Sequence, residues 1–271
     1  MDIKVLGPLE AQECGVSIVP TAGKPRQLLA VLALCAGQVV TVAGLMEELW
    51  STDLPRSAPT TLQTYILQLR RRLEIALAND ERTAKDVLIT RHTGYLLDAR
   101  PGEVDVQEYD QLAAAGHRAL DAHDFEAASR LLGNALSLWR GPALVDVQAG
   151  PRLEIEVMRL EESRLGVLES RIDADLRLGR HHMLLSELAV LCAQHPLHEN
   201  LHAQHMVALY RSGRQWRALD VYNRLRGTLV DELGVEPSPR LQHLQRAILT
   251  SDPVLDEPWQ KGDSVAAQLV V

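Results

Sequence analysis

The chain contains few of the residues that stabilise small secreted or metal-binding folds. Its 271 residues include 3 cysteines and 1 Phe, and aromatic residues make up only 4%. Cys14, Cys35 and Cys192 are odd in number, lie far apart and form no CxxC pair. This indicates neither a disulfide framework nor a zinc knuckle. Scarce aromatic residues beside abundant Ala, Leu and Arg favour helix-rich packing over an all-β sandwich.

Long apolar runs and catalytic signatures are missing as well. No stretch reaches the ~18 consecutive apolar residues of a membrane-spanning helix, and the first residues, "MDIKVLGPLE", do not have the pattern of a signal peptide. We therefore expect a cytoplasmic protein with no membrane partner. The sequence has no GxxxxGK[ST] phosphate loop, no GxGxxG after a strand and no GxSxG nucleophile elbow. It predicts a protein that is not an enzyme and needs no cofactor.

Charge is distributed unevenly over the chain. The formal net charge is −8, yet residues 1–100 hold 11 basic and 11 acidic side chains, while residues 101–271 hold 17 and 25. Between residues 55 and 75, Arg56, Arg70, Arg71 and Arg72 stand against Glu74 alone. A local basic patch on a neutral background fits a nucleic-acid partner, whereas the acidic second part fits protein partners or a small effector.

The first hundred residues predict a winged helix-turn-helix domain. Short alternating runs over residues 3–9 and 16–19, separated by "GP" and "CG" turns, predict antiparallel strands. Helices are expected from Pro25 to about Gly37, from an N-cap at Thr41, and from about Ser57. The segment "VLITRHTGYLL" then predicts a β-hairpin. Strands, three helices and a hairpin give a DNA-binding domain over residues 1–100.

Helix follows helix after a linker at residues 98–105. The segment from Leu178 aligns with the segment from Ser212 at an offset of 34 residues, which places Gly179 on Gly213 and Arg180 on Arg214. This period is typical of tetratricopeptide-like helix pairs. The sequence therefore predicts a mainly α fold with small β elements: a winged helix, then an all-α helical-repeat domain over 104–250. Residues 251–271 lack helical periodicity and are expected to form a disordered tail.

The predicted third helix contains "TLQTYILQLRRRL", residues 61–73, and has two different faces. A stripe within about 100° of arc is apolar and expected to face the core: Leu62, Tyr65, Ile66, Leu69 and Leu73. The opposite face has no acidic residue: Thr60, Thr64, Leu67, Gln68 and Arg71. An arbitrary helix with such a face is usually just solvated. In third position before a hairpin, however, this is where a winged domain has its recognition helix.

Each residue type on that face suits a different part of the duplex. Arg and Gln can form bidentate bonds to base edges in the major groove, and Thr and Leu methyl groups can meet thymine. Arg70, Arg71 and Arg72 are expected mainly to bind phosphate, which gives affinity without sequence preference. Arg91, near the hairpin tip, can enter the adjacent minor groove, because the negative potential of the groove attracts arginine.

Four segments resemble one known family. They are "TLQTYILQLRRRL", "TRHTGYLL", "VDVQEYDQL" and "ALYRSGR…ALDVY…LVDELGVEPSP", and the likeness covers about residues 1–250. They resemble the SARP-type regulators, the antibiotic regulatory proteins of streptomycetes, which join an OmpR-like winged helix, as in two-component-like phosphorelay output domains, to a bacterial transcriptional activation domain. The resemblance implies an activator of a secondary-metabolite gene cluster that binds tandem direct repeats in double-stranded DNA near the −35 region. It also implies contact with RNA polymerase holoenzyme and self-association on DNA.

The resemblance extends to the DNA-binding residues. The reading positions of the family fall on Thr60, Thr61, Thr64, Leu67, Gln68 and Arg71, and the basic wing position falls on Arg91, ahead of the pair Gly94 and Tyr95. With the phosphate arginines, the expected DNA-binding set is Thr60, Thr61, Thr64, Leu67, Gln68, Arg70, Arg71, Arg72, Arg91 and Tyr95. Two departures from the family, Gln68 in place of Arg or Lys and His92-Thr93 in place of two prolines, imply an altered base preference and a more flexible wing tip.

Two other interpretations compete with this one. His198, His202 and His205 share one helix face at a spacing that can bind zinc. Since no cysteine or aspartate clusters nearby, a core or groove position is the better interpretation, and we expect no metal. The second alternative is a helical-repeat interaction or sensor protein whose winged domain binds protein rather than DNA.

Overall fold

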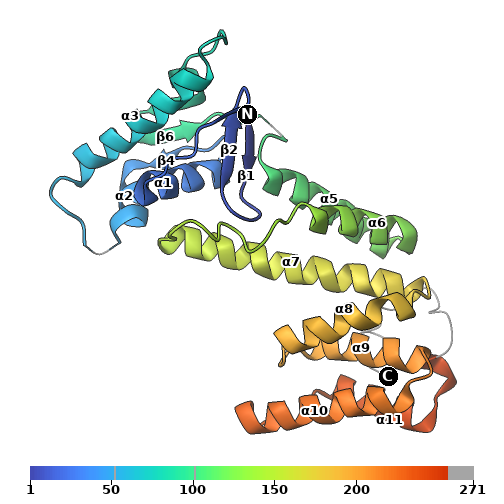
Figure 1. Cartoon of the computed structure of the whole chain (residues 1–271). Helices are drawn as coiled ribbons and strands as arrows, with labels where there is room; N and C mark the ends of the chain where they lie inside the picture. Colours follow the sequence, from blue (N-terminus) through green and yellow to red (C-terminus); the bar gives the residue numbers. More distant parts are fainter. Residues whose placement is uncertain (52, 101, 256–271) are drawn as a thin grey trace. The chain divides into compact units, whose positions relative to one another are not determined.

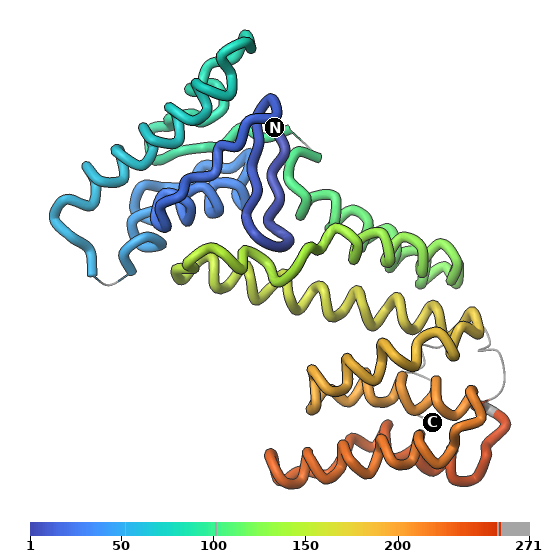
Figure 2. The backbone as a smooth tube through the Cα atoms, in the orientation of Figure 1, coloured from blue at the N-terminus to red at the C-terminus, as the bar shows by residue number. Residues whose placement is uncertain are grey.

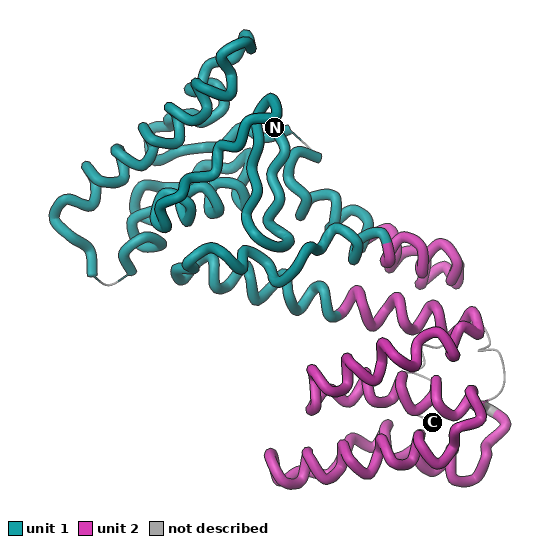
Figure 3. The backbone as a smooth tube through the Cα atoms, viewed as in Figure 1, with its two compact units in different colours: residues 1–113, 134–165 teal, residues 114–133, 166–271 magenta. Residues whose placement is uncertain are grey.

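The computed structural model describes residues 1–51, 53–100 and 102–255 (Figure 1). Contacts between Cα atoms divide the chain into two compact units (Figure 3). Unit 1 consists of residues 1–113 and 134–165, and unit 2 of residues 114–133 and 166–271. Two helices, α5 (Asp105–Asp121) and α7 (Pro151–Arg177), contribute residues to both units. The domain boundary near residue 100 was predicted from the composition of a linker, whereas the two units are defined by contacts in space. The predicted boundary therefore stays a prediction.

Unit 1 begins with a small antiparallel sheet, as the sequence predicts. It consists of β1 (Asp2–Lys4), β2 (Glu10–Glu13) and β3 (Val16–Ser17), with Ile3 opposite Ala11. Three helices follow: α1 (Gly23–Leu34), α2 (Val42–Trp50) and α3 (Ala58–Ala76). The predicted cap of α2 is confirmed, because the Thr41 hydroxyl oxygen accepts the backbone N–H of Gly44 at 3.1 Å.

The predicted hairpin forms a three-stranded wing. Its strands β4 (Val40–Thr41), β5 (Leu88–Arg91) and β6 (Gly94–Leu97) are arranged in the order β4-β6-β5. A Cβ atom at Gly94 would lie 1.9 Å from the Val40 carbonyl oxygen, so only glycine allows β4 and β6 to pair here. The winged helix-turn-helix and the mainly α fold are thereby confirmed.

One helix of unit 1 was not predicted. The polar segment "ANDERTAKD" contains α4 (Ala84–Val87). Its start is fixed by Asp86, whose carboxylate accepts the backbone N–H of Thr83 at 2.8 Å and the Thr83 hydroxyl at 2.7 Å. A single turn stabilised by one side chain has no periodic apolar pattern, and the sequence therefore gives no helical signal.

Within unit 1, a buried carboxylate connects α2 to the start of α7. Glu48 is 2% exposed, and its two oxygens accept the backbone N–H groups of Gly150 and Arg152, each at 2.8 Å, and of Leu153 at 3.3 Å. The Gln27 side-chain amide donates a fourth bond at 3.0 Å. A carboxyl group is tolerated in this buried place because its oxygens meet the otherwise unpaired N–H groups at the first turn of a helix.

Unit 2 consists of helical hairpins. Besides parts of α5 and α7 it contains most of α6 (Phe125–Ser137), then α8 (His181–Gln194), α9 (Glu199–Arg211), α10 (Gln215–Leu233) and α11 (Pro239–Thr250). The trace in Figure 2 shows α8, α9 and α10 as successive rods that run back and forth, with α9 in the middle. This is the tetratricopeptide-like packing that the sequence predicts.

The 34-residue repeat is visible in the backbone of the turns. Gly179 and Gly213 have φ of +73° and +71°, and each is followed by an arginine whose N–H reaches back five residues at 2.9 Å, to Asp175 and Leu209. His123 repeats the turn between α5 and α6, with φ +60° and a bond from Asp124 to Ala119 at 2.9 Å. All three turns are Schellman motifs. The sequence comparison did not detect the turn at His123, because histidine occupies the position that glycine has in the other two.

The end of the described chain is helical. A short helix, η1 (Pro253–Leu255), follows α11, and Leu255 is 2% exposed. Residues 256–271, most of the predicted disordered tail, lie outside the described residues. In the part that is described, no helix is both long and apolar enough to span a bilayer.

Candidate nucleic-acid interface

The inner face of α3 is part of the core of unit 1, as predicted. Leu62 is 1% exposed, and the later leucines and isoleucine of the stripe are similarly buried: Ile66, Leu69 and Leu73. Tyr65 lies at the edge of the stripe, half-buried, with its ring stacked on Trp50 at a centroid distance of 6.3 Å. Burial of this stripe fixes which face of α3 is turned to solvent.

The outward face of α3 presents a continuous row of side chains. Of the expected reading residues, Thr61 is half-buried. The other five are exposed: Thr60, Thr64, Leu67, Gln68 and Arg71. Leu67 is 53% exposed. The Thr64 hydroxyl donates to the Thr60 carbonyl at 3.0 Å, so only its oxygen lone pairs and methyl group remain for a partner. The face therefore combines apolar, amide and cationic contacts without an acidic residue.

Three consecutive arginines have different surroundings. The half-buried Arg70 binds the wing: its Nη2 donates to the Leu88 carbonyl at 2.7 Å and to the Thr90 hydroxyl at 2.8 Å. Arg72 is half-buried and Arg71 is exposed. The sequence assigned all three to phosphate and missed the contact with the wing, since no local pattern relates residues 70 and 88. A phosphate contact of Arg70 stays a prediction, for which its Nη1 is available.

The wing places its basic residue at the tip. Arg91 is exposed and stands opposite Gly94, while Tyr95 is half-buried between Val40 and Thr90 in the ladder. The Thr93 carbonyl accepts the backbone N–H of Val42 at 3.0 Å, which connects the tip to the start of α2, and the flexibility implied by the departure from the family pattern stays a prediction. Within residues 1–51, 53–100 and 102–255, neither Arg71 nor Arg91 forms an ion pair. Both cations are thus available to phosphate.

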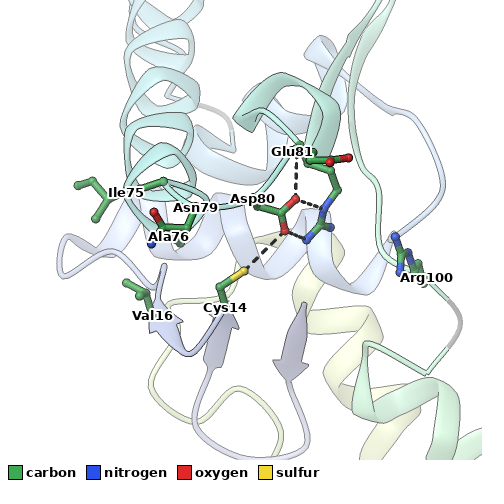
Figure 4. A pocket seen from close by; sticks show the side chains of 10 residues that line it. Cys14, Val16, Ile75, Ala76, Asn79, Asp80, Glu81 and Arg100 are labelled. Carbon is green, nitrogen blue, oxygen red and sulfur yellow. Dashed lines mark hydrogen bonds and ion pairs between the residues drawn. The ribbon is translucent and has the colours of Figure 1, made fainter.

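A second cluster of polar side chains in unit 1 is held together by ion pairs and hydrogen bonds. It lines a cavity of about 680 Å³ at the end of α3, where Cys14 contacts Asp80 and Asp80 pairs with Arg82 (Figure 4). Arg82 also binds Glu13 at 2.8 Å, and its hydrogen bonds lower the pKa of Asp80. Desolvation and the neighbouring carboxylates raise the pKa of the Cys14 thiol. With its carboxylates paired and its thiol protonated, the cluster is poorly suited to bind a metal.

The histidines considered for zinc binding are placed differently from a metal site. In the described ranges, Glu13, Cys14 and Asp80 are the one group of three candidate ligands whose atoms lie within 4.8 Å of one another. His202 and His205 are 7% and 8% exposed on α9. His198 instead pairs with Glu169 at 2.9 Å. The core or groove interpretation therefore describes His202 and His205 better.

Known family models match most of the chain. Residues 17–97 match the family described as "Transcriptional regulatory protein, C terminal", and residues 104–249 match "Bacterial transcriptional activator domain". The two matches lie on the winged helix and on the helices from α5 to α11. They correspond to the two functions, DNA reading and activation, that the sequence assigns to these regions.

Relatives match over nearly the whole chain. The regulatory protein DnrI of Streptomyces peucetius is 58% identical over 257 residues, 94% of either chain. The regulatory protein AfsR of Streptomyces coelicolor is 41% identical over 93% of this chain, which spans 24% of AfsR. The structure of Mycobacterium tuberculosis EmbR in complex with a low-affinity phosphopeptide has a TM-score of 0.85 at 33% identity, over 93% of this chain and 65% of EmbR.

These matches agree with the architecture and decide the family. A relative with 58% identity aligns over 94% of both chains, and on this chain the two family models match in the order in which the structure has the winged helix and the helical region. Members of this group are transcriptional regulators rather than enzymes, in agreement with the missing catalytic signatures. The chain therefore belongs to the SARP-type transcriptional regulators, which join an OmpR-like winged helix to a bacterial transcriptional activation domain.

Proposed function

We propose that the chain is a sequence-specific DNA-binding transcriptional activator that reads the major groove with the outward face of α3. The observation that carries this proposal is the exposed row on α3, which has no acidic residue and lies opposite a buried core stripe. The residues proposed to contact DNA are Thr60, Thr61, Thr64, Leu67, Gln68, Arg70, Arg71, Arg72, Arg91 and Tyr95.

The members of this set have separate tasks. Gln68 is suited to a bidentate bond with adenine, and the exposed Leu67 is suited to contact with a thymine methyl group. Arg71 and Arg72 supply phosphate contacts from the same helix. Arg91 enters the minor groove beside the wing, and Tyr95 supports that strand from within the ladder.

The chain acts on promoters through its helical region as well. We propose that two copies bind tandem direct repeats near the −35 region, associate on the DNA, and contact RNA polymerase holoenzyme through the activation domain. The match of residues 104–249 to an activator domain and the excess of acidic residues after residue 100 support this assignment. A cytoplasmic location and control of a secondary-metabolite gene cluster follow from the same proposal.

Selection of bound duplexes from a random pool with the full-length chain tests this function. We expect a consensus of two spaced direct repeats. Leu67→Ala and Gln68→Ala should each relax the preference at one position per repeat, at a cost of about 1–3 kcal/mol for a lost base contact. Arg130→Ala, an exposed arginine on α6, is the control and should leave the consensus unchanged.

Two results would count against the proposal. If the full-length chain shows no preference over random duplex at low salt, the winged domain does not read DNA, and the protein-binding alternative gains. If the consensus is recovered but both α3 variants select the same sequence as the parent, another surface reads the bases. A consensus with one half-site would contradict the proposed pairing of two copies.

A further inference from the structure

A cleft of about 310 Å³ opens within unit 2 between α8, α9 and α10. Its floor is α9, in which every residue from Leu201 to Leu209 is buried. Residues of α8 and α10 form the two walls. Its volume lies near the lower end of the range of about 300–1,000 Å³ that small-molecule sites occupy. The cleft is therefore large enough for a compact organic ligand.

The floor of the cleft carries two buried histidines. His202 and His205 are 7% and 8% exposed and lie three residues apart, so both are on the same face of α9. Desolvation lowers the pKa of His202 and lowers that of His205 to about 4. Both imidazoles are therefore neutral near neutral pH, and each offers hydrogen-bonding nitrogens rather than a charge.

The hydrogen bonds of these histidines are incomplete. His202 uses its Nδ1 with the His198 carbonyl at 3.1 Å, which makes Nδ1 the protonated nitrogen and leaves the lone pair on Nε2. The Nδ1 atom of His205 is buried and has no hydrogen-bond partner among the described residues. Since a buried N–H without a partner is rarer in proteins than a buried lone pair without one, we assign the lone pair of the neutral His205 ring to Nδ1 and its proton to Nε2.

The walls define the chemistry of the occupant. Ala189 and Ala193 are one helical turn apart on α8 and leave a flat, apolar wall opposite Val221 and Leu225. The lining contains no carboxylate, and its one charged side chain is Arg224, at the exposed rim. Arg224 pairs with Asp220 at 2.7 Å, but a surface pair of this kind is weak and can be exchanged for a ligand.

We propose that this cleft binds a small aromatic carboxylic acid. The ring lies between the alanine wall of α8 and the apolar side chains of α10, and the carboxylate accepts the Nε2–H of His205 and pairs with the guanidinium of Arg224. A flat apolar body suits the alanine wall, and an acidic group suits a lining that has bases but no acids.

Isothermal titration of the full-length chain with 1-hydroxy-2-naphthoate tests the proposal. The methyl ester of the same compound, which keeps the rings and loses the charge, should bind at least about tenfold more weakly. Ala193→Trp fills the cleft from an exposed rim position and should abolish binding. Val190→Trp is the matched control, because Val190 is 56% exposed on α8 and does not line the cleft.

A third variant, His205→Leu, removes the Nε2–H donor of His205 from the floor and should weaken binding of the acid by about tenfold or more. The melting temperature of His205→Leu shows whether this variant keeps its fold. If it does not fold, the comparison of Ala193→Trp with Val190→Trp tests the proposal. The proposal is overturned if the parent gives no binding up to about 1 mM acid. It is equally overturned if Ala193→Trp binds as Val190→Trp does, or if the ester binds as tightly as the acid.

Discussion

Neighbouring residues of one type serve different purposes in α3. Arg70 donates three hydrogen bonds, two to the carbonyl of Leu88 and one to the hydroxyl of Thr90, whereas Arg71 is exposed to solvent. A helix turns by 100° per residue, so three consecutive arginines cannot share one environment. The run "RRR" therefore combines a contact within the domain with a cation available to DNA.

At Arg71 the expected effect is on the strength and salt dependence of DNA binding. Arg71→Ala should weaken binding to the selected duplex and to unrelated duplexes alike, because a phosphate contact carries no sequence preference. The slope of log Kd against log salt concentration should fall by about 1. Arg130→Ala, which removes the same charge from α6, should leave the slope as it is. An unchanged slope in Arg71→Ala would remove Arg71 from the phosphate-binding set.

At the scale of elements, α3 and the wing behave as one reading unit because Arg70 joins them. The planar guanidinium binds two acceptors at once on β5, a geometry that lysine cannot reproduce. Arg70 therefore helps to fix the helix that carries Arg71 relative to the strand that carries Arg91.

Arg70→Lys separates this role from a simple phosphate contact. The variant keeps the charge but loses the fork of bonds to β5, so the free energy of local opening of β5 should fall by about 1 kcal/mol. Hydrogen exchange of the amides in residues 88–91 measures it. Arg72→Lys serves as the control and should exchange like the parent. Were Arg70 only a phosphate ligand, both lysine variants would show the same protection.

Local sequence patterns predict the elements of this protein far better than the contacts between them. Apolar spacing at Leu62, Ile66 and Leu69 predicts both α3 and its buried face correctly. Leu67 follows from the same periodicity as the apolar residue on the opposite side. The bond from Arg70 to Leu88 has no local signature, because it depends on how the hairpin folds back on α3.

At the scale of the whole molecule, Glu48 is the side chain that connects segments far apart in the sequence. It lies on α2 of the winged helix and caps α7 about a hundred residues later. Sequence reasoning could not assign this role, because one glutamate in an amphipathic helix resembles a surface residue until its partners are known. Gly150 is required at the same place, since a Cβ there would lie 2.1 Å from the Glu48 carbonyl oxygen.

Glu48→Gln should loosen the first turn of α7. The amide nitrogen would replace one carboxylate oxygen and face N–H groups that need an acceptor, so the free energy of opening should fall by about 2–3 kcal/mol. Hydrogen exchange of the amides of residues 152–156 measures the loss. Glu47→Gln, at the exposed neighbouring position, should show the parent's protection. Equal protection in both variants would mean that α7 does not depend on this carboxylate.

The Schellman turns at His123, Gly179 and Gly213 have a consequence for how such a chain can change in length. Each of these turns joins the two helices of one pair and is closed by main-chain hydrogen bonds. A helix pair that is duplicated or deleted as a unit therefore keeps its own turn intact. Regulators with this architecture can therefore become longer or shorter in evolution by gaining or losing one helix pair at a time.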